Sequence, residues 1–170
     1  MRSAETGKCQ ACRYFANQPV LGRGGIFVSS VTGNALAETL DRMVAHLCRA
    51  CRPVAVYLFG SQATGSARAD SDIDLAVLLP KEATLPVTER LELVGELEEL
   101  AERKVDLVIL NHAKLPLQFE VIHDGKLLHE ADHDARTDAE DLIVRDYLDL
   151  KPMYERSYRE ILEDSQGSQR

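Results

Sequence analysis

The stretch Val54-Ala-Val-Tyr-Leu-Phe-Gly-Ser61, followed after ten residues by Asp72-Ile-Asp-Leu-Ala-Val-Leu-Leu79, decides the fold of this chain. Its two apolar runs are rich in β-branched, aromatic and aliphatic residues and are too short for ordinary helices, which indicates buried strands. The residues between them, 60–71, are mostly small and polar, which is typical of a loop. The sequence therefore predicts two strands joined by a polar loop.

Further elements are predicted on both sides of this pair, from apolar residues at helical spacing and from two more short apolar runs. The predicted helices cover 34–51, 87–101, 118–123 and 134–164, and the further strands cover 104–110 and 126–130. Pro152 lies inside the last helix and should kink it. This order predicts an α/β (α+β) domain, with a small mixed β-sheet flanked by helices and a long C-terminal helix.

The first part of the chain differs from the rest. Residues 1–30 show no periodicity and contain Gly22, Gly24 and Gly25, so we expect a poorly ordered leader. A chain of 170 residues has room for one domain of ordinary size. We therefore expect a single domain over residues 31–170, including the C-terminal helix.

The composition limits the classes of partner. The 28 acidic residues outnumber the 20 basic ones, which gives a net charge of −8 and a pI of about 5.1. Such a chain is a poor candidate for direct binding to nucleic acid, and it suits a basic partner or an anionic substrate bridged by metal ions. Its longest relevant apolar run, residues 54–59, is far shorter than the roughly 20 residues that span a bilayer. The N-terminus lacks the apolar core of a secretory signal, so we expect a cytoplasmic protein.

Four cysteines form two pairs, Cys9-x-x-Cys12 and Cys48-x-x-Cys51, a pattern that suggests zinc in a reducing compartment. The 35 residues between Cys12 and Cys48 exceed the usual separation of about 15–20. The second pair also falls on an apolar helical stripe, where thiols pack like small hydrophobic groups. Zinc binding and core packing both remain open.

Three aspartates carry the chemistry that the sequence suggests. Because side chains alternate along a strand, Asp72 and Asp74 should point to one face and Ile73 to the core. Asp106 opens a later strand and could join them from a neighbouring position. Carboxylates this close repel each other unless a cation lies between them, and carboxylate oxygens, water and phosphates are the ligands of Mg²⁺.

The start of the loop suits a phosphate. Gly60 allows close backbone approach, and Ser61 offers a hydroxyl and an N–H to a phosphate oxygen. Arg68 could also reach a phosphate, or it could simply lie in solvent. An isolated Asp-x-Asp is usually a solvated strand end, but the combination at this spacing predicts a site for two magnesium ions and a nucleoside triphosphate. One metal would activate an attacking hydroxyl and the other would stabilise the leaving pyrophosphate.

The motif Gly60-Ser61, ten residues, then Asp72-x-Asp74, with Asp106 further on, resembles the minimal nucleotidyltransferases (MNT) of the DNA polymerase β superfamily. The run Phe119-Glu-Val-Ile-His-Asp-Gly-Lys-Leu-Leu128, with the long helix after it, is similar to the MntA-like antitoxins that pair with HEPN toxins. The resemblance covers roughly residues 34–163.

This resemblance implies a role for each site residue. Asp72 and Asp74 would hold both magnesium ions, and Asp106 would bind the catalytic metal and help to deprotonate the acceptor hydroxyl. Gly60 and Ser61 would hold the triphosphate of ATP. In that family the acceptor is a tyrosine of a cognate HEPN ribonuclease toxin, which transferred AMP (AMPylation) silences.

Three functions stay open at this point. The first is an adenylyltransferase antitoxin that modifies its toxin. The second is an antitoxin that neutralises its toxin by binding alone, and the third is a small-molecule nucleotidyltransferase of the aminoglycoside type. The motif does not fix the nucleotide base or the number of AMP units, and homo-oligomers or hetero-oligomers with the toxin are compatible with it.

Overall fold

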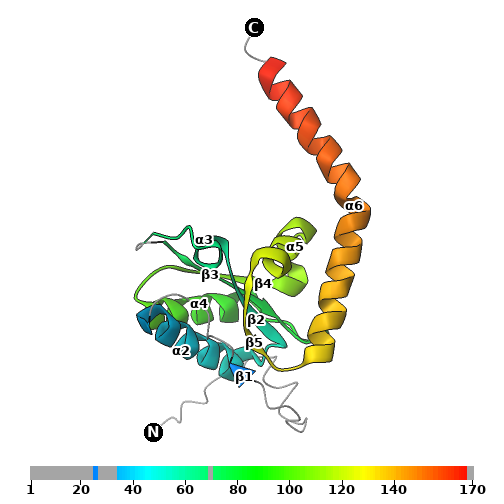
Figure 1. The fold of residues 1–170 in the computed structure, drawn as a ribbon. Helices are drawn as coiled ribbons and strands as arrows, with labels where there is room; N and C mark the ends of the chain where they lie inside the picture. Colours follow the sequence, from blue (N-terminus) through cyan, green and yellow to red (C-terminus); the bar gives the residue numbers. More distant parts are fainter. Residues whose placement is uncertain (1–24, 27–33, 69–70, 168–170) are drawn as a thin grey trace, which may run out of the picture.

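A computed structural model of the chain describes residues 25–26, 34–68 and 71–167. The expected leader, residues 1–30, lies outside the described residues except for a two-residue strand, and the first cysteine pair lies outside them entirely. The rest of the described chain forms helices on both sides of one sheet (Figure 1).

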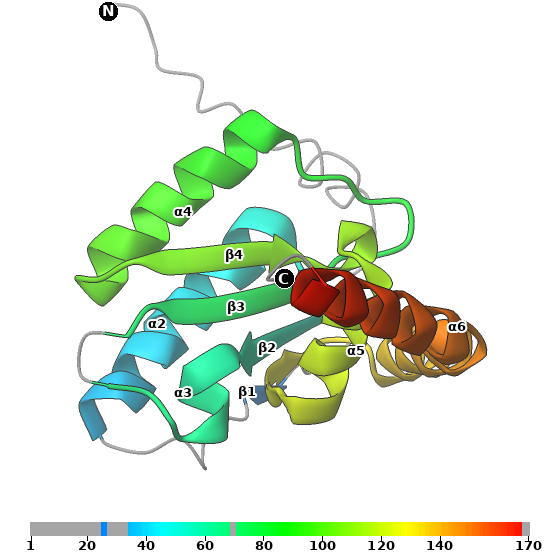
Figure 2. The same ribbon diagram turned by 90° about the horizontal axis from the view of Figure 1, so that it is seen from above.

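Within the described residues, the sheet has five strands in the order β1-β5-β2-β3-β4. The strands are β1 (Gly25–Ile26), β2 (Ala55–Phe59), β3 (Ile73–Leu78), β4 (Val105–Ile109) and β5 (Lys126–Glu130). Strands β3 and β4 are parallel and all other neighbours are antiparallel, so the sheet is mixed, as predicted. Figure 2 shows β3 and β4 running side by side.

The helices of the described chain are α2 (Asn34–Cys51), α3 (Gly60–Thr64), α4 (Val87–Ala101), α5 (Leu115–Asp124) and α6 (His133–Gly167), with a 3-10 turn, η1 (Leu110–His112). The α/β class, the mixed sheet and the long C-terminal helix are therefore confirmed. Helix α5 begins three residues earlier than predicted, because Pro116 lies in its first turn, where the missing N–H costs nothing.

The loop predicted over residues 60–71 is only partly a loop, because it begins with the short helix α3. Gly65, in the left-handed conformation, ends this helix by donating its N–H to the carbonyl of Ser61. Gln62 and Ala63 are buried on its inner side. Tertiary packing thus makes a helical turn from residues whose composition favours a loop.

The two faces of the sheet carry separate cores (Figure 1). One face packs against α2 and α4 through side chains such as Leu58, Ile73 and Leu75. The other packs against α5 and the start of α6 through Tyr57 and Ala76, among others. This alternation decides on which face the polar residues of β3 and β4 lie.

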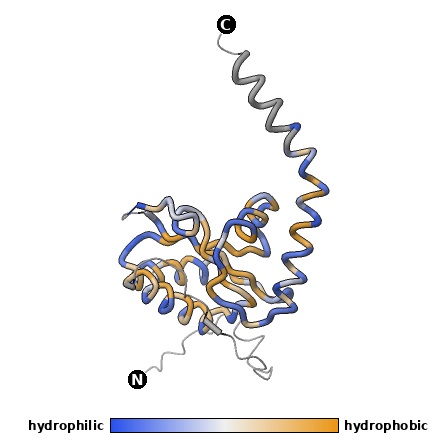
Figure 3. Tube along the Cα trace, in the orientation of Figure 1, coloured by the Kyte–Doolittle hydropathy of each residue, from blue (hydrophilic) through white to orange (hydrophobic). Residues whose placement is uncertain are grey.

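Of the α6 side chains that the structure describes, those in the first turns pack on the domain. Ile143 is buried, and the ring of Tyr147 stacks on that of Phe119 with centroids 4.0 Å apart. Further along, Leu148 and Met153 are more than half exposed, and α6 leaves the domain and changes direction near its middle (Figures 1 and 3). The predicted apolar face of α6 is therefore covered by other described residues only over its first turns.

No helix in the described ranges is both long enough and apolar enough to cross a membrane.

Candidate active site

Two of the predicted acidic residues lie directly opposite each other on neighbouring strands. Asp74 is the second residue of β3 and Asp106 the second residue of β4, and the parallel register pairs them. Asp74 also pairs with Phe59, the last residue of β2. Because Ile73 and Leu75 point to the core between the sheet and α2, Asp74 lies on the opposite face, toward α5.

Asp72 lies one residue before β3 and is exposed. Its negative charge still affects the pKa of Asp74. Burial raises the pKa of Asp74, and the negative charges of Asp106 and then Asp72 raise that pKa further. The three carboxylates therefore share one electrostatic site, in which a cation would relieve their repulsion.

Gly60 stands against this site at the end of β2. Its φ is +65°, a conformation that side-chain-bearing residues avoid. A Cβ added at Gly60 would collide with Oδ2 of Asp74, closer than real Cβ atoms come to any neighbour. Glycine is therefore needed here both for the backbone conformation and for the space that the Asp74 carboxylate occupies.

Ser61 and Arg68 lie on the turn that follows. Ser61 is half-buried in α3, and its carbonyl accepts hydrogen bonds from the backbone N–H groups of Gly65 and Ser66. Arg68 is exposed, and its backbone N–H donates to the Ser71 hydroxyl over 2.8 Å. The structure thus places Ser61 beside Gly60 and leaves the Arg68 guanidinium open to solvent.

The acidic residues offer a donor set that fits magnesium. Mg²⁺ takes one or two protein carboxylates and completes its octahedron with water and substrate phosphates. The opposed pair of Asp74 and Asp106, with Asp72 nearby, supplies such oxygens. Among the residues that the structure describes, no group of three or more His, Cys, Asp or Glu forms a ready metal cage, so substrate oxygens and water would have to complete the coordination.

The described cysteines favour packing over zinc binding. Cys51 is buried in the core and its Sγ–H donates to the Leu47 carbonyl over 3.3 Å. Burial raises the pKa of Cys48, which keeps that thiol protonated. Neither residue forms a disulfide. Cys9 and Cys12 lie outside the described residues.

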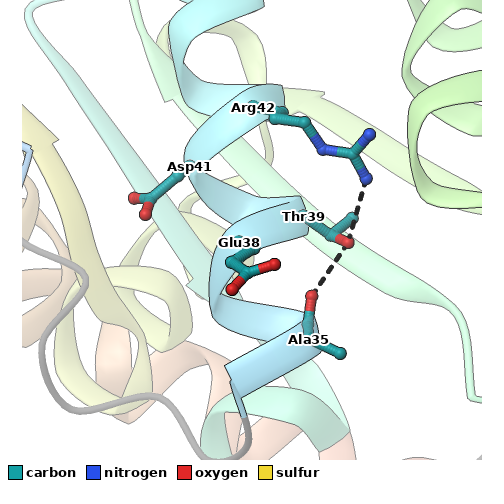
Figure 4. A pocket seen from close by; sticks show the side chains of 5 residues that line it. All are labelled: Ala35, Glu38, Thr39, Asp41 and Arg42. Carbon is teal, nitrogen blue, oxygen red and sulfur yellow. Dashed lines mark hydrogen bonds between the residues drawn. The ribbon is translucent and has the colours of Figure 1, made fainter.

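A separate surface hollow lies beside α2, on the other side of the sheet from Asp74 (Figure 4). Thr39 and Arg42 line it, and Arg42 also donates to the Leu100 carbonyl at the end of α4 over 3.2 Å. This contact ties α2 to α4. Because α2 covers the face of the sheet opposite Asp74, the hollow is not part of the acidic site.

Sequence reasoning missed a polar network that fixes α6 on the sheet. The Tyr57 hydroxyl donates to Oε1 of Glu140 over 2.6 Å, and the Arg136 guanidinium bridges Glu140 and Glu130. Tyr57 lies inside an apolar run and the other three residues resemble ordinary surface charges. No local signal in the sequence indicated that they meet.

Comparison with known proteins supports this picture. The family described as "Polymerase beta, Nucleotidyltransferase" matches residues 44–134. A protein adenylyltransferase MntA of Aphanizomenon flos-aquae is 37% identical over 81 residues, which cover 43% of this chain and 54% of that protein. A protein of the same name from Shewanella oneidensis is 41% identical over 73 residues, covering 43% and 51%. The chain thus spans about half the length of the curated relatives it matches.

Solved structures share the fold. A toxin–antitoxin crystal structure with AMP-PNP superposes with a TM-score of 0.58 at 29% identity, covering 74% of this chain and 98% of that one. A complex of the tri-AMPylated Shewanella oneidensis HEPN toxin with an MNT antitoxin gives a TM-score of 0.57 at 25% identity, covering 76% and 97%.

The matched range takes in the end of β2, the turn after it and both acid-bearing strands. It includes Gly60, Ser61 and the three aspartates, and it covers more than half of the chain. The opposed carboxylates and the glycine fitted against one of them lie inside the segment that defines the family. The chain belongs to the polymerase beta nucleotidyltransferase family.

Proposed function

We propose that this protein is an adenylyltransferase antitoxin, which transfers AMP from ATP to a tyrosine of a cognate HEPN ribonuclease toxin. In this reaction the tyrosine oxygen attacks the α-phosphorus of ATP, its proton passes to a carboxylate, and pyrophosphate leaves. ATP and Mg²⁺ are abundant in the cytoplasm, where we expect the reaction to occur.

Each site residue has a role in this proposal. Asp72 and Asp74 hold two magnesium ions, and Asp106 holds the catalytic one and accepts the proton of the acceptor hydroxyl. Gly60 and Ser61 hold the triphosphate. When bound, the ions lower the pKa of the attacking hydroxyl and neutralise charge on the leaving pyrophosphate.

One observation carries the proposal. Asp74 and Asp106 are register partners on adjacent parallel strands, and the backbone of Gly60 lies against the Asp74 carboxylate where no side chain would fit. Burial, and then the charges of Asp106 and Asp72, raise the pKa of Asp74, so a charged Asp74 at this position is unfavourable without a cation. A structural role gives no reason to keep such neighbouring acidic residues, whereas metal-assisted phosphoryl transfer uses clustered carboxylates to hold its ions.

The relatives support the choice of acceptor. Two matched proteins are called protein adenylyltransferases, and one matched structure holds an AMPylated HEPN toxin with its MNT antitoxin. Another holds AMP-PNP. These properties belong to those proteins, and we extend them to this chain because the site geometry agrees with the same chemistry.

The test is label transfer from α-³²P-ATP with Mg²⁺, with and without a HEPN toxin of the organism that encodes this protein. We expect label on the toxin, lost with Asp74→Asn and with Asp106→Asn and abolished by changing the acceptor tyrosine to Phe. Asp41→Asn, on α2 across the sheet, is the matched control and should label normally.

Other results would select the alternatives. If wild-type protein neutralises the toxin without labelling it, and Asp74→Asn neutralises equally well, the protein acts by binding alone. Label on an aminoglycoside but not on the toxin would identify a small-molecule enzyme instead.

A further inference from the structure

The three acidic residues of the site are held in different ways. Asp74 and Asp106 lie within strands, where the hydrogen bonds of the sheet fix their backbones. Asp72 lies outside the sheet, because β3 begins at Ile73. A residue proposed to hold two metal ions needs some other support.

We propose that Gln62 and Ser71 form a positioning pair, which ties the turn after β2 to the backbone that carries Asp72. This inference rests on the proposed nucleotidyl transfer. The pair would keep Ser61, on the phosphate side, and Asp72, on the metal side, at a fixed separation.

Gln62 is placed for this role. It follows Ser61 in α3, and together with His129 it is one of two buried polar side chains among the described residues. Its Nε2 group donates toward the carbonyl of Ser71 at 3.5 Å. Burying an amide is unfavourable unless it is hydrogen-bonded, so this contact gives the position a reason to be polar.

Ser71 is engaged through its backbone and its side chain. Its Oγ accepts from the backbone N–H of Arg68 over 2.8 Å, and its own N–H donates to the Arg68 carbonyl over 3.1 Å. With the contact from Gln62, the N–H, the carbonyl and the hydroxyl of Ser71 each have a partner. Three hydrogen bonds therefore hold Ser71, the residue before Asp72.

The residue after Asp72 is fixed as well. Ile73 is fully buried, and its N–H donates to the Lys104 carbonyl over 3.0 Å, next to β4. Asp72 is thus exposed but lies between two anchored neighbours. Removing the hydrogen bonds on one side should allow the Asp72 carboxylate to move. Displacements near 1 Å at such sites lower the rate on the order of a hundredfold.

The test uses two variants and a matched control. Gln62→Met keeps the length of the side chain and removes the N–H donor to the Ser71 carbonyl. Ser71→Ala keeps that carbonyl and removes the hydroxyl that accepts from the Arg68 N–H. Ser66→Ala is the control, because Ser66 lies on the same turn and, within the described residues, its hydroxyl bonds only that of Thr64, over 2.9 Å. Ser71→Thr retains a hydroxyl and should restore function.

The readout is the affinity for Mn²⁺ with a non-hydrolysable ATP analogue, followed by electron paramagnetic resonance, beside the Mg²⁺ dependence of transfer. We expect both variants to weaken metal binding by about tenfold or more, the range seen when groups that orient metal ligands are changed. The thermal midpoint in the absence of metal and nucleotide should stay close to that of the wild type for Ser71→Ala. Ser66→Ala should match the wild type throughout.

Unchanged Mn²⁺ affinity in folded Ser71→Ala and Gln62→Met would overturn the proposal, as would equal loss in Ser66→Ala. If Gln62→Met does not fold, Gln62→Leu replaces it, because Ser71→Ala and Ser71→Thr both keep the carbonyl that Gln62 contacts. The readout needs no acceptor, so it separates this inference from the proposed function. If the variants bind metal more weakly but the wild type never labels the toxin, the positioning role of Gln62 and Ser71 is supported and the toxin is not the substrate.

Discussion

One half of the site lies on strands and the other half on a turn, and different interactions hold the two halves in place. Asp74 is half-buried and Asp106 is exposed, and both lie within strands, where the parallel register of β3 and β4 fixes their separation. Ser61, Arg68 and Asp72 lie on or next to the turn between β2 and β3, where single hydrogen bonds replace the ladder.

This difference suggests separate contributions of the strand half and the turn half to the site. The sheet provides rigid acidic residues whose mutual repulsion is unavoidable, because strand spacing holds neighbouring residues within about 5 Å. The turn provides groups whose positions depend on a few single hydrogen bonds. Changes in the strand half should therefore affect charge and chemistry, whereas changes in the turn half should affect binding and placement.

The largest effect is expected for Asp74→Asn, which keeps the size of the side chain and removes its charge. Transfer from ATP should fall by at least about a thousandfold, since lost metal-assisted charge stabilisation amounts to several kcal/mol and each 1.4 kcal/mol is a factor of ten. Initial rates at saturating Mg²⁺ measure this. Recovery of the rate at high Mg²⁺ would show that Asp74 assists binding only and would contradict its proposed role.

A smaller but still severe effect is expected for Gly60→Ala, with Gly65→Ala as its control. Both glycines have positive φ, +65° and +77°, so both changes should cost about 1–2 kcal/mol of folding free energy. Only at Gly60 does the new methyl group collide with Asp74, whereas nothing lies within 4 Å at Gly65.

Gly60→Ala should therefore lose a further 1–3 kcal/mol or so of stability and about a hundredfold in transfer rate. Gly65→Ala should retain most of its rate. Denaturant unfolding and initial rates of both variants give the comparison, and equal rates in the two would contradict the steric argument.

The pH dependence of stability should also separate Asp74 from the other acidic residues. Its folded-state pKa is raised above the ordinary 3.8, so the folded protein holds this proton more tightly than the unfolded chain. The stability from Asp74 is therefore fully present below that pH and is lost as pH rises through the raised pKa.

Without metal, the wild type should thus lose stability relative to Asp74→Asn as pH rises above 3.8, and the variant should be at least as stable at pH 7. Added Mg²⁺ should stabilise the wild type at pH 7 and leave the variant nearly unchanged. Thermal unfolding across this pH range measures both. If Asp74→Asn is less stable than the wild type at pH 7 without metal, the charge of Asp74 does not destabilise the folded protein and this prediction is wrong.

The sequence predicted the strand half of the site better than the turn half. Alternation along Asp72-Ile73-Asp74 correctly placed Ile73 in the core, because period-two burial is a local property. The pairing of Asp74 with Asp106 depends on strand register across some 30 residues, which no local pattern contains. The motif suggested that they meet without giving the register.

The turn half depends on tertiary contacts. The helix α3 was predicted as loop because Gly, Ser and Thr disfavour helices, yet the burial of Gln62 and Ala63 stabilises one turn. Similarly, apolar residues at helical spacing predicted the helix over 134–164, but of its described side chains only those in the first turns pack against α5 and the sheet. Periodicity shows which face of a helix is apolar and does not show what covers it.

The smallest effect is expected for Arg68→Ala in the turn half. The Arg68 side chain is exposed, and its backbone, which bonds Ser71, is unchanged by the substitution. If the guanidinium reaches a phosphate of bound ATP, the KM for ATP should rise by about tenfold, the value of one charge-assisted hydrogen bond, with kcat nearly constant. Stability should change by less than about 0.5 kcal/mol, because no packing is lost. Steady-state kinetics with varied ATP make the distinction: an unchanged KM assigns Arg68 to solvent, and a fall in kcat at constant KM would place it in the chemical step rather than in ATP binding.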